Sequence, residues 1–298
     1  MSGKYSKADI SRIAESIIED LRECEDGTIT STSRLAYKFR YMDLETEDLY
    51  ELHDAIFRVA KANKIKLDMS EHDGKLEGLP FNLTFVVKNK KAQIKCPRCG
   101  SIDTARYIYG YPAFSEEMEK KLKEGKWALG GCCMNGVEIN GQFVETMPTR
   151  YCNNCKKDFG SAPILITRKT GMAEDYRDIV KSIKFSVGGY SGGYTVVTIS
   201  QNSEGANVNV QKFPNGLDIP ENKQITKSKW NKIVNTLYSQ LYLNEWKKRF
   251  VDPQVLDGTQ WSLDINLSNR RARHYYGSND YPPYWPELKK IFGEFAKL

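Results

Sequence analysis

The chain has 298 residues, of which 40% are hydrophobic and 28% charged, enough to bury the cores of two or three domains and to exclude a largely disordered protein. No apolar run approaches the roughly 20 residues of a membrane-spanning helix, and the N-terminus lacks the apolar stretch of a secretory signal, so we expect a cytoplasmic protein without membrane contact. The net charge of +6 is uneven: −3 in residues 1–90, +5 in residues 91–170 and +4 in residues 171–298. A polyanionic partner would therefore be drawn to the middle and C-terminal parts.

Residues 1–90 predict three helices followed by two strands. Apolar side chains recur at helical spacing over residues 10–21, which indicates a first helix. Thr30 and Ser31 suit the N-terminal cap of a short second helix, and a third helix begins near Thr46. The runs IKLDM and LTFVV then follow as strands.

This order of elements resembles a winged helix-turn-helix domain. In such a fold the start of the third helix normally meets the major groove of DNA. Here that segment carries Glu45, Glu47, Asp48 and Glu51, whose carboxylates would be repelled by phosphates. DNA recognition and a structural or protein-contact role both remain open, and the charge pattern favours the second.

Two C-x-x-C pairs are the strongest chemical signal in the middle part. They supply Cys96, Cys99, Cys152 and Cys155, and four thiolates match the tetrahedral preference of Zn²⁺. In a reducing compartment, cysteines are more often thiols or metal ligands than disulfides. We therefore predict one structural zinc ion held by these four residues, with no ligand position left for catalysis.

The 52 residues between the two pairs do not argue against a shared ion. Lengthening a flexible loop to that size costs only about 1.5 kcal/mol, whereas zinc binding contributes on the order of 10–16 kcal/mol in small zinc domains. The insert also predicts a strand at TARYIYGYP, a helix at SEEMEKKLKEGK and a second strand at KWALGGCCM. Residues 91–170 thus predict a zinc ribbon with a helical insert.

CPRCGS, ARYIYGYPAF, LGGCCMNG and YCNNC together resemble a zinc-ribbon module of uncharacterised bacterial multi-domain proteins. The resemblance covers residues 94–160 and implies a fold without implying an activity. Cys132 and Cys133 lie inside it and have two interpretations, a redox or metal-competing pair or the packing of one thiol as a small hydrophobe. Neighbouring side chains of a strand point to opposite faces, which favours packing, and Cys24 receives the same interpretation.

Residues 171–298 predict an α+β domain with an antiparallel sheet. IKFSVGGYSGGYTVVTIS and ANVNVQKF read as strands, with GGYSGG as a turn because it lacks the lysine of a phosphate-binding loop. A helix is expected from Asn222 through Phe250. WSLDINL alternates as a strand, RHYY returns beside it, and PELKKIFGEFAKL forms a last helix with Pro286 in its first turn.

The stretch HYYGSNDYPPYWPELKK is dense in aromatic residues, and its surroundings resemble the C-terminal domains of other uncharacterised bacterial proteins. In one interpretation these side chains stack on a nucleotide or another ligand beside arginines. In the other they fill the core between sheet and last helix. Together with two lysines of the second knuckle, the candidate binding residues are Lys156, Lys157, Arg270, Arg271, Arg273, Tyr276, Tyr281, Tyr284 and Trp285.

The sequence as a whole favours binding over catalysis. We expect a zinc-stabilised protein that contacts nucleic acid or a protein partner. The alternative is an enzyme or prokaryotic defence effector with a site near His274, Tyr276 and Asp280, although no known catalytic motif includes them. A third alternative is a scaffold that oligomerises through its acidic third helix.

Overall fold

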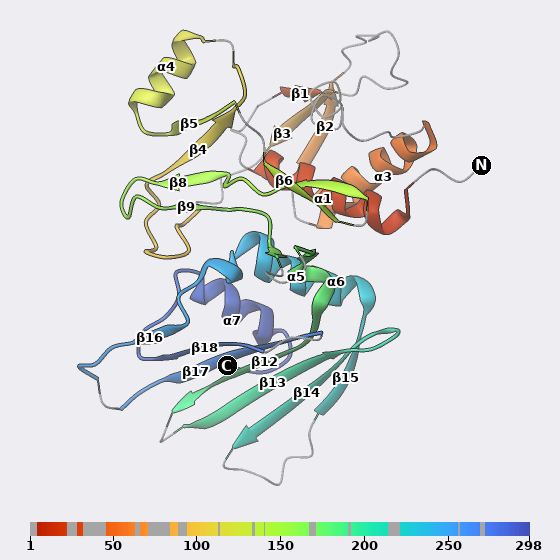
Figure 1. Cartoon of the computed structure of the whole chain (residues 1–298). Coiled ribbons are helices and arrows are strands. Elements are labelled where there is room, and N and C mark those ends of the chain that lie inside the picture. Colours follow the sequence, from red (N-terminus) through yellow and green to blue (C-terminus); the bar gives the residue numbers. More distant parts are fainter. Residues whose placement is uncertain are drawn as a thin grey trace. The chain divides into compact units, whose positions relative to one another are not determined.

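The structure is a computed structural model of the chain, and it divides into two compact units, Met1–Gln93 and Ile94–Leu298 (Figure 1). It describes residues 5–22, 29–31, 46–62, 66–70, 84–88, 94–112, 114–132, 135–139, 141–166, 171–189, 192–213, 221–255, 257–268 and 272–298. Among these residues, no helix has the length and apolar character required to span a membrane. The predicted boundary between a zinc-ribbon domain ending at residue 170 and an α+β domain beginning at residue 171 stays a prediction.

The first unit combines two amphipathic helices with a small antiparallel sheet. Helices α1 (Lys7–Arg22) and α3 (Thr46–Ala62) bury apolar faces, with Ile10 and Ile56 each almost fully enclosed. Strands β1 (Ile29–Ser31), β2 (Lys66–Ser70) and β3 (Thr84–Lys88) form the sheet in the order β1-β3-β2. The first and third predicted helices and both predicted strands are confirmed. Thr30 and Ser31 lie in β1, and the predicted second helix falls on residues outside those described.

The acidic start of α3 is engaged within the first unit. Asp48 is 2% exposed, and its Oδ1 accepts a hydrogen bond from the backbone N–H of Tyr5 at 3.1 Å. Glu51 pairs with Arg58 at 2.7 Å and with Lys7 at 3.8 Å. Two of the four carboxylates that the sequence analysis counted against DNA binding are therefore neutralised or enclosed inside the unit.

The second unit begins with the cysteine-bearing segment, whose insert folds as predicted. Strand β4 (Thr104–Tyr109), helix α4 (Glu116–Lys123) and strand β5 (Trp127–Gly131) form a crossover that makes β4 and β5 parallel. The Ser115 hydroxyl caps α4 by accepting from the Met118 N–H at 3.2 Å. Strands β8 (Arg150–Cys152) and β9 (Asp158–Phe159) complete a sheet in the order β5-β4-β8-β9. Between β5 and β8 along the chain, β6 (Gly136–Ile139) pairs with β7 (Gln142–Glu145) in a separate two-stranded sheet.

A seven-stranded sheet follows after a short ribbon of β10 (Ile164–Ile166) and β11 (Ala173–Asp175). Its order is β15-β14-β13-β12-β17-β18-β16, and every neighbouring pair is antiparallel except β16 with β18. The mixed α+β class is confirmed, as are the predicted strands. Their bounds are β12 Val180–Gly189, β13 Gly193–Gln201, β14 Gly205–Phe213, β15 Glu221–Thr226, β16 Arg249–Val251, β17 Gln260–Leu267 and β18 Arg273–Ser278.

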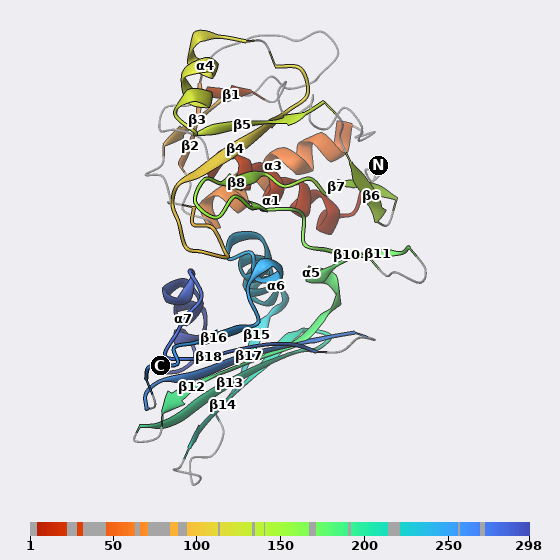
Figure 2. The ribbon, with the colours of Figure 1, turned by 60° about the vertical axis from the view of Figure 1, so that its left-hand side comes forward.

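Helices cover one face of this sheet (Figure 2). They are α5 (Tyr176–Ile179), α6 (Lys227–Asn235) with a π-helical turn at Thr236–Gln240, a 3₁₀ turn at Leu243–Glu245, and α7 (Trp285–Gly293). Phe185 of β12 stacks on Phe292 of α7 with ring centroids 4.5 Å apart, and both side chains are fully buried. The hydrophobic core therefore lies between the helices and this face.

The predicted helix from Asn222 through Phe250 is wrong at both ends. Residues 221–226 extend the sheet as β15 instead, since each of them pairs with a residue of β14 between Gly205 and Val210. Thr226 then caps α6, with its hydroxyl accepting from the Lys229 N–H at 3.3 Å. The helical run ends where Tyr242 takes a left-handed conformation with φ of 53°, which no helix can continue.

The opposite face of the sheet carries no helix among the described residues of the second unit (Figure 2). It mixes polar side chains with the half-exposed rings of Tyr194, Phe213 and Tyr276. The strand register places Lys184, Asp264 and His274 side by side on it. Asn266 donates to Ser182 across two strands at 2.7 Å. This face is solvent-facing in the way typical of antiparallel sheets.

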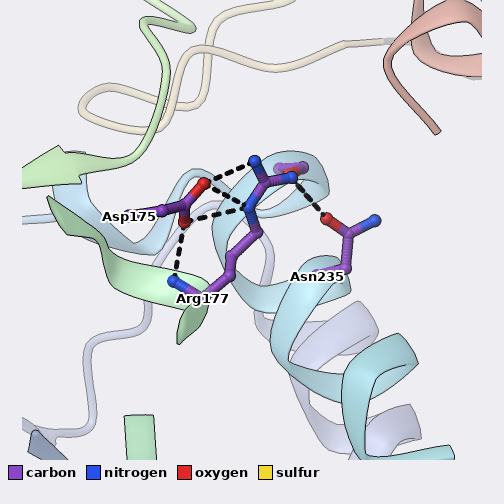
Figure 3. A network of polar contacts seen from close by, with 4 residues as sticks. Asp175, Arg177 and Asn235 are labelled. Atoms are coloured by element: carbon purple, nitrogen blue, oxygen red, sulfur yellow. Dashed lines mark hydrogen bonds and ion pairs between the residues drawn. The ribbon is translucent and has the colours of Figure 1, made fainter. Parts of the chain in front are cut away.

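A part-buried ion pair of β11 and α5 is extended to α6 by a hydrogen bond (Figure 3). Asp175 is 6% exposed and accepts from the Arg177 guanidinium at 2.6 Å and from the Arg177 N–H at 2.7 Å. The remaining side of the guanidinium donates to Asn235 Oδ1 at 3.0 Å. Because every partner of this network lies on a different element, it fixes the β11–α5 corner against α6.

Candidate metal centre

The two C-x-x-C segments fold into matching knuckles. In the first, the Gly100 N–H donates to the Cys96 carbonyl at 2.9 Å, and in the second the Lys156 N–H donates to the Cys152 carbonyl at 2.9 Å. Gly100 and Lys156 each adopt a left-handed conformation, with φ of 76° and 56°. Glycine takes this conformation freely, whereas a lysine pays a conformational cost that the knuckle must offset.

The four thiols converge on one point. The sulfur atoms of Cys96, Cys99, Cys152 and Cys155 all lie within 4.8 Å of one another. The Cys96–Cys155 and Cys99–Cys152 sulfur pairs are 3.7 and 3.5 Å apart. A tetrahedral ion with metal–sulfur bonds of about 2.3 Å places its ligands roughly 3.8 Å apart. The predicted residues therefore form a cluster that can hold a metal ion.

Without a cation, the cluster does not favour four thiolates. Burial raises the pKa of Cys96 to about 12. Burial also acts to raise the pKa of Cys99, but a hydrogen bond from the Ser101 backbone and contacts with the other thiols bring it down to about 7. A bound divalent cation would remove the remaining protons, because metal ligation requires thiolates.

The first knuckle is tied to the sheet domain by Tyr284, which precedes α7. The Tyr284 side chain is 6% exposed, and its hydroxyl accepts from the Lys95 N–H at 3.0 Å and donates to the Lys95 carbonyl at 2.7 Å. The Lys95 ammonium also pairs with Glu287 of α7 at 3.5 Å. The residue next to the first metal-binding cysteine is thus held by the C-terminal helix.

The second knuckle is tied to the same domain by Glu245. Its Oε1 accepts from the Gly160 N–H at 2.7 Å, and its Oε2 pairs with Arg98 at 3.4 Å. Burial raises the pKa of Glu245, while the Gly160 amide and Arg98 act against that rise. Beside it, the rings of Phe159 and Tyr242 meet edge to face with centroids 5.6 Å apart. One carboxylate therefore contacts both halves of the metal-binding segment.

The candidate binding residues are not brought together on one surface. Lys156 and Lys157 are exposed at the second knuckle, whereas Tyr284 is buried. Arg273 donates to the Tyr176 hydroxyl at 2.6 Å on the helix-covered side, and Tyr276 lies on the opposite face of the sheet. Tyr281 and Trp285 pack on each other with centroids 4.8 Å apart, against the core. Arg270 and Arg271 lie outside the described residues.

Cys132 is separate from the cluster. Cys132 is exposed, so the packing interpretation does not describe this thiol. Cys133 and Cys24 lie outside the described residues. The cluster found among the described residues contains four cysteines, and Cys132 is not one of them.

The residues of the enzyme alternative are partly adjacent. His274 contacts Asp264 through Nδ1 and stacks on Tyr276 with centroids 5.3 Å apart, on the open face of the sheet. The Asp280 carboxylate instead accepts from the Tyr281 N–H at 2.8 Å. His274 and Asp264 thus form a pair on the protein surface, and their contacts do not support the catalytic interpretation.

Glu245 was missed in the sequence, and Tyr284 was considered only as a ligand-binding or core residue. Neither position belongs to a motif, because their partners are backbone groups of a segment far away in the chain. Searches against protein families, curated proteins and solved structures found no match to this chain. The site is therefore interpreted from its own geometry.

Proposed function

We propose that this chain is a zinc-stabilised intracellular binding protein in which the metal has no catalytic role. The supporting observation is the convergence of four cysteine sulfurs, because four thiolates fill a tetrahedral coordination sphere and leave no position for water or substrate. Thiolate ligands in this number favour zinc or an iron–sulfur cluster over harder cations. The zinc ribbon would then act as a brace for the sheet domain.

The first unit is proposed to be winged-helix-like. In support, α1 and α3 pack together and the sheet order is β1-β3-β2, with β2 and β3 as a hairpin after the last helix. The engagement of Asp48 and Glu51 within the unit weakens the charge argument against nucleic acid that the sequence suggested.

Nucleic acid is the proposed ligand of the second unit. Residues 91–298 together carry a net charge of +9, whereas residues 1–90 carry −3. Exposed Lys156 and Lys157 lie at the knuckle, and an exposed tyrosine, Tyr276, lies on the open sheet face. Basic side chains neutralise phosphates, and exposed aromatic rings stack on bases of single strands.

The test is fluorescence anisotropy with labelled single-stranded and duplex oligonucleotides at several salt concentrations. We expect binding that weakens with salt, and a further loss in the double variant Lys156→Glu/Lys157→Glu. The matched control is Lys120→Glu/Lys297→Glu, which makes the same charge change at two exposed positions away from the knuckle. Unchanged affinity in the knuckle variant would contradict the proposal and leave a protein partner as the ligand.

A further inference from the structure

A hollow of about 390 Å³ lies on the cysteine-bearing segment, away from the cluster's sulfur atoms. Tyr107 and Tyr109 of β4 line it, and Asp158 of β9 closes one side. Leu129, Met147 and Pro148 add apolar walls. Successive odd positions of β4 point to the same face of the sheet, so the alternation in ARYIYGYP is what places both rings there.

The two rings are held in place by hydrogen bonds at their hydroxyl groups. The Tyr107 hydroxyl donates to Asp158 Oδ1 and the Tyr109 hydroxyl donates to the Pro148 carbonyl, each at 2.7 Å. The ring centroids are 5.6 Å apart, and Tyr151 meets Tyr107 edge to face at 6.3 Å. A ligand that enters the hollow therefore meets rings that are already oriented.

Gly130 makes room for one of these rings. A Cβ at this position would lie 2.2 Å from a ring carbon of Tyr109. Any larger residue would push Tyr109 out of its place, so the glycine belongs to the construction of the hollow. At this point the backbone of β5 is in direct contact with the Tyr109 ring of β4.

The charge of the hollow is negative. Its lining includes one carboxylate, Asp158, and no lysine or arginine. Burial raises the pKa of Tyr109, and the carboxylates of Asp158 and Glu145 raise it further. Burial likewise raises the pKa of Tyr107, so both rings stay neutral and keep the negative potential of an aromatic face.

We propose that this hollow binds an organic cation, an alkylammonium group held between the tyrosine rings and Asp158. Ring faces attract cations, a carboxylate adds Coulomb attraction, and the apolar walls accommodate methyl or methylene groups. An anionic ligand would be repelled by Asp158, and a neutral aromatic ligand would gain nothing from it. The volume lies within the range of small-molecule sites. This proposal does not rest on nucleic-acid binding or on a bound metal.

The test is a titration of the full-length, metal-loaded protein with choline chloride, followed by isothermal calorimetry or by NMR of the tyrosine rings. Sodium chloride at equal ionic strength serves as the blank. We expect saturable binding with a dissociation constant of about 1 mM, and a loss of roughly five- to tenfold in Asp158→Asn and in Tyr109→Leu. Asp158→Asn keeps an oxygen acceptor for the Tyr107 hydroxyl, so its effect reports the charge.

Tyr111→Leu is the matched control, because Tyr111 is 96% exposed and does not line the hollow. It should bind choline as the unchanged protein does. Unchanged metal content in each variant shows that the segment is folded. A peptide carrying trimethyl-lysine distinguishes two sources of the trimethylammonium group. If the peptide binds more tightly than choline, the natural ligand is a modified side chain of a protein; if it binds more weakly, the natural ligand is a small organic cation. Absence of saturation up to roughly 100 mM choline, or equal affinity in all three variants, would overturn the proposal.

Discussion

The hydroxyl of Tyr284 accepts a hydrogen bond from the N–H of Lys95 and donates one to its carbonyl, although 189 residues separate the two in the chain. Lys95 directly precedes Cys96, the first cysteine of the cluster. The C-terminal domain therefore holds the backbone from which the metal site begins. A metal ion bound by the cluster would therefore be energetically linked to the folding of the sheet domain.

Tyr284→Phe should destabilise the second unit by about 1–3 kcal/mol, since both Lys95 backbone groups lose their partner in a part-buried position. Urea unfolding of the metal-loaded protein measures the change. Tyr276→Phe, on the exposed face of the sheet, should stay within about 0.5 kcal/mol. Equal effects of the two variants would show that the Tyr284 contact does not stabilise the fold.

Gly100 and Lys156 occupy equivalent positions of the two knuckles and should respond oppositely to substitution. Gly100→Ala should cost about 1 kcal/mol because of its positive φ alone, since the added Cβ would meet Pro283 at an ordinary 3.7 Å. Lys156→Gly should leave stability unchanged or raise it by less than about 1 kcal/mol. Thermal unfolding with bound metal tests both. A Lys156→Gly variant less stable than Gly100→Ala would contradict the equivalence.

Glu245 provides a prediction that depends on pH. Burial raises its pKa in the folded state, so the folded protein holds this proton more readily than the unfolded chain does. Its contribution to stability is therefore largest below the unfolded value of about 4.5 and falls as pH rises through the folded pKa. Glu245→Gln lacks this dependence. The free energy of unfolding of the variant, minus that of the unchanged protein, should therefore increase as pH rises.

Glu245→Ala separates the hydrogen bond from the charge. It leaves the Gly160 N–H without its acceptor and should cost about 1–3 kcal/mol at neutral pH. Glu245→Gln keeps an acceptor for the Gly160 N–H, and its loss of the pairing with half-exposed Arg98, worth about 0–1 kcal/mol, is offset because the variant no longer buries a charge. Chemical unfolding at several pH values measures both variants. If the alanine and glutamine variants were equally stable, the Gly160 hydrogen bond would not be significant.

Arg177→Lys should destabilise the corner between α5 and α6 by about 1–3 kcal/mol. A lysine cannot bind Asp175 with two parallel donors and reach Asn235 at the same time, which leaves part of a buried carboxylate poorly paired. Arg249→Lys, at an exposed position of β16, is the matched control and should be nearly neutral. Hydrogen exchange of the α5 amides locates the effect. If the α5 amides were equally protected from exchange in both variants, Arg177 would not stabilise this corner.

The cysteine cluster and most regular elements were predictable because they depend on local patterns. C-x-x-C spacing identified the four cysteines that converge, and strict alternation in WSLDINL identified β17. The end of the helical run that begins with α6 was not predictable, because it depends on the left-handed Tyr242, a tyrosine in a conformation that its side chain disfavours. Edge strand β15 was mistaken for helix since its residues acquire strand structure by pairing with β14. The roles of Tyr284 and Glu245 depend on backbone groups far away in the chain, so no pattern in the neighbouring residues could predict them.

The most direct test of this account is the zinc content of protein purified without added metal, measured by mass spectrometry for the unchanged chain, Cys155→Ser and Cys132→Ser. Cys155 belongs to the cluster and Cys132 is an exposed thiol outside it. We predict one zinc ion per chain, retained in Cys132→Ser and lost or strongly reduced in Cys155→Ser. Zinc retained in Cys155→Ser and lost in Cys132→Ser would contradict the four-cysteine centre on which the account rests.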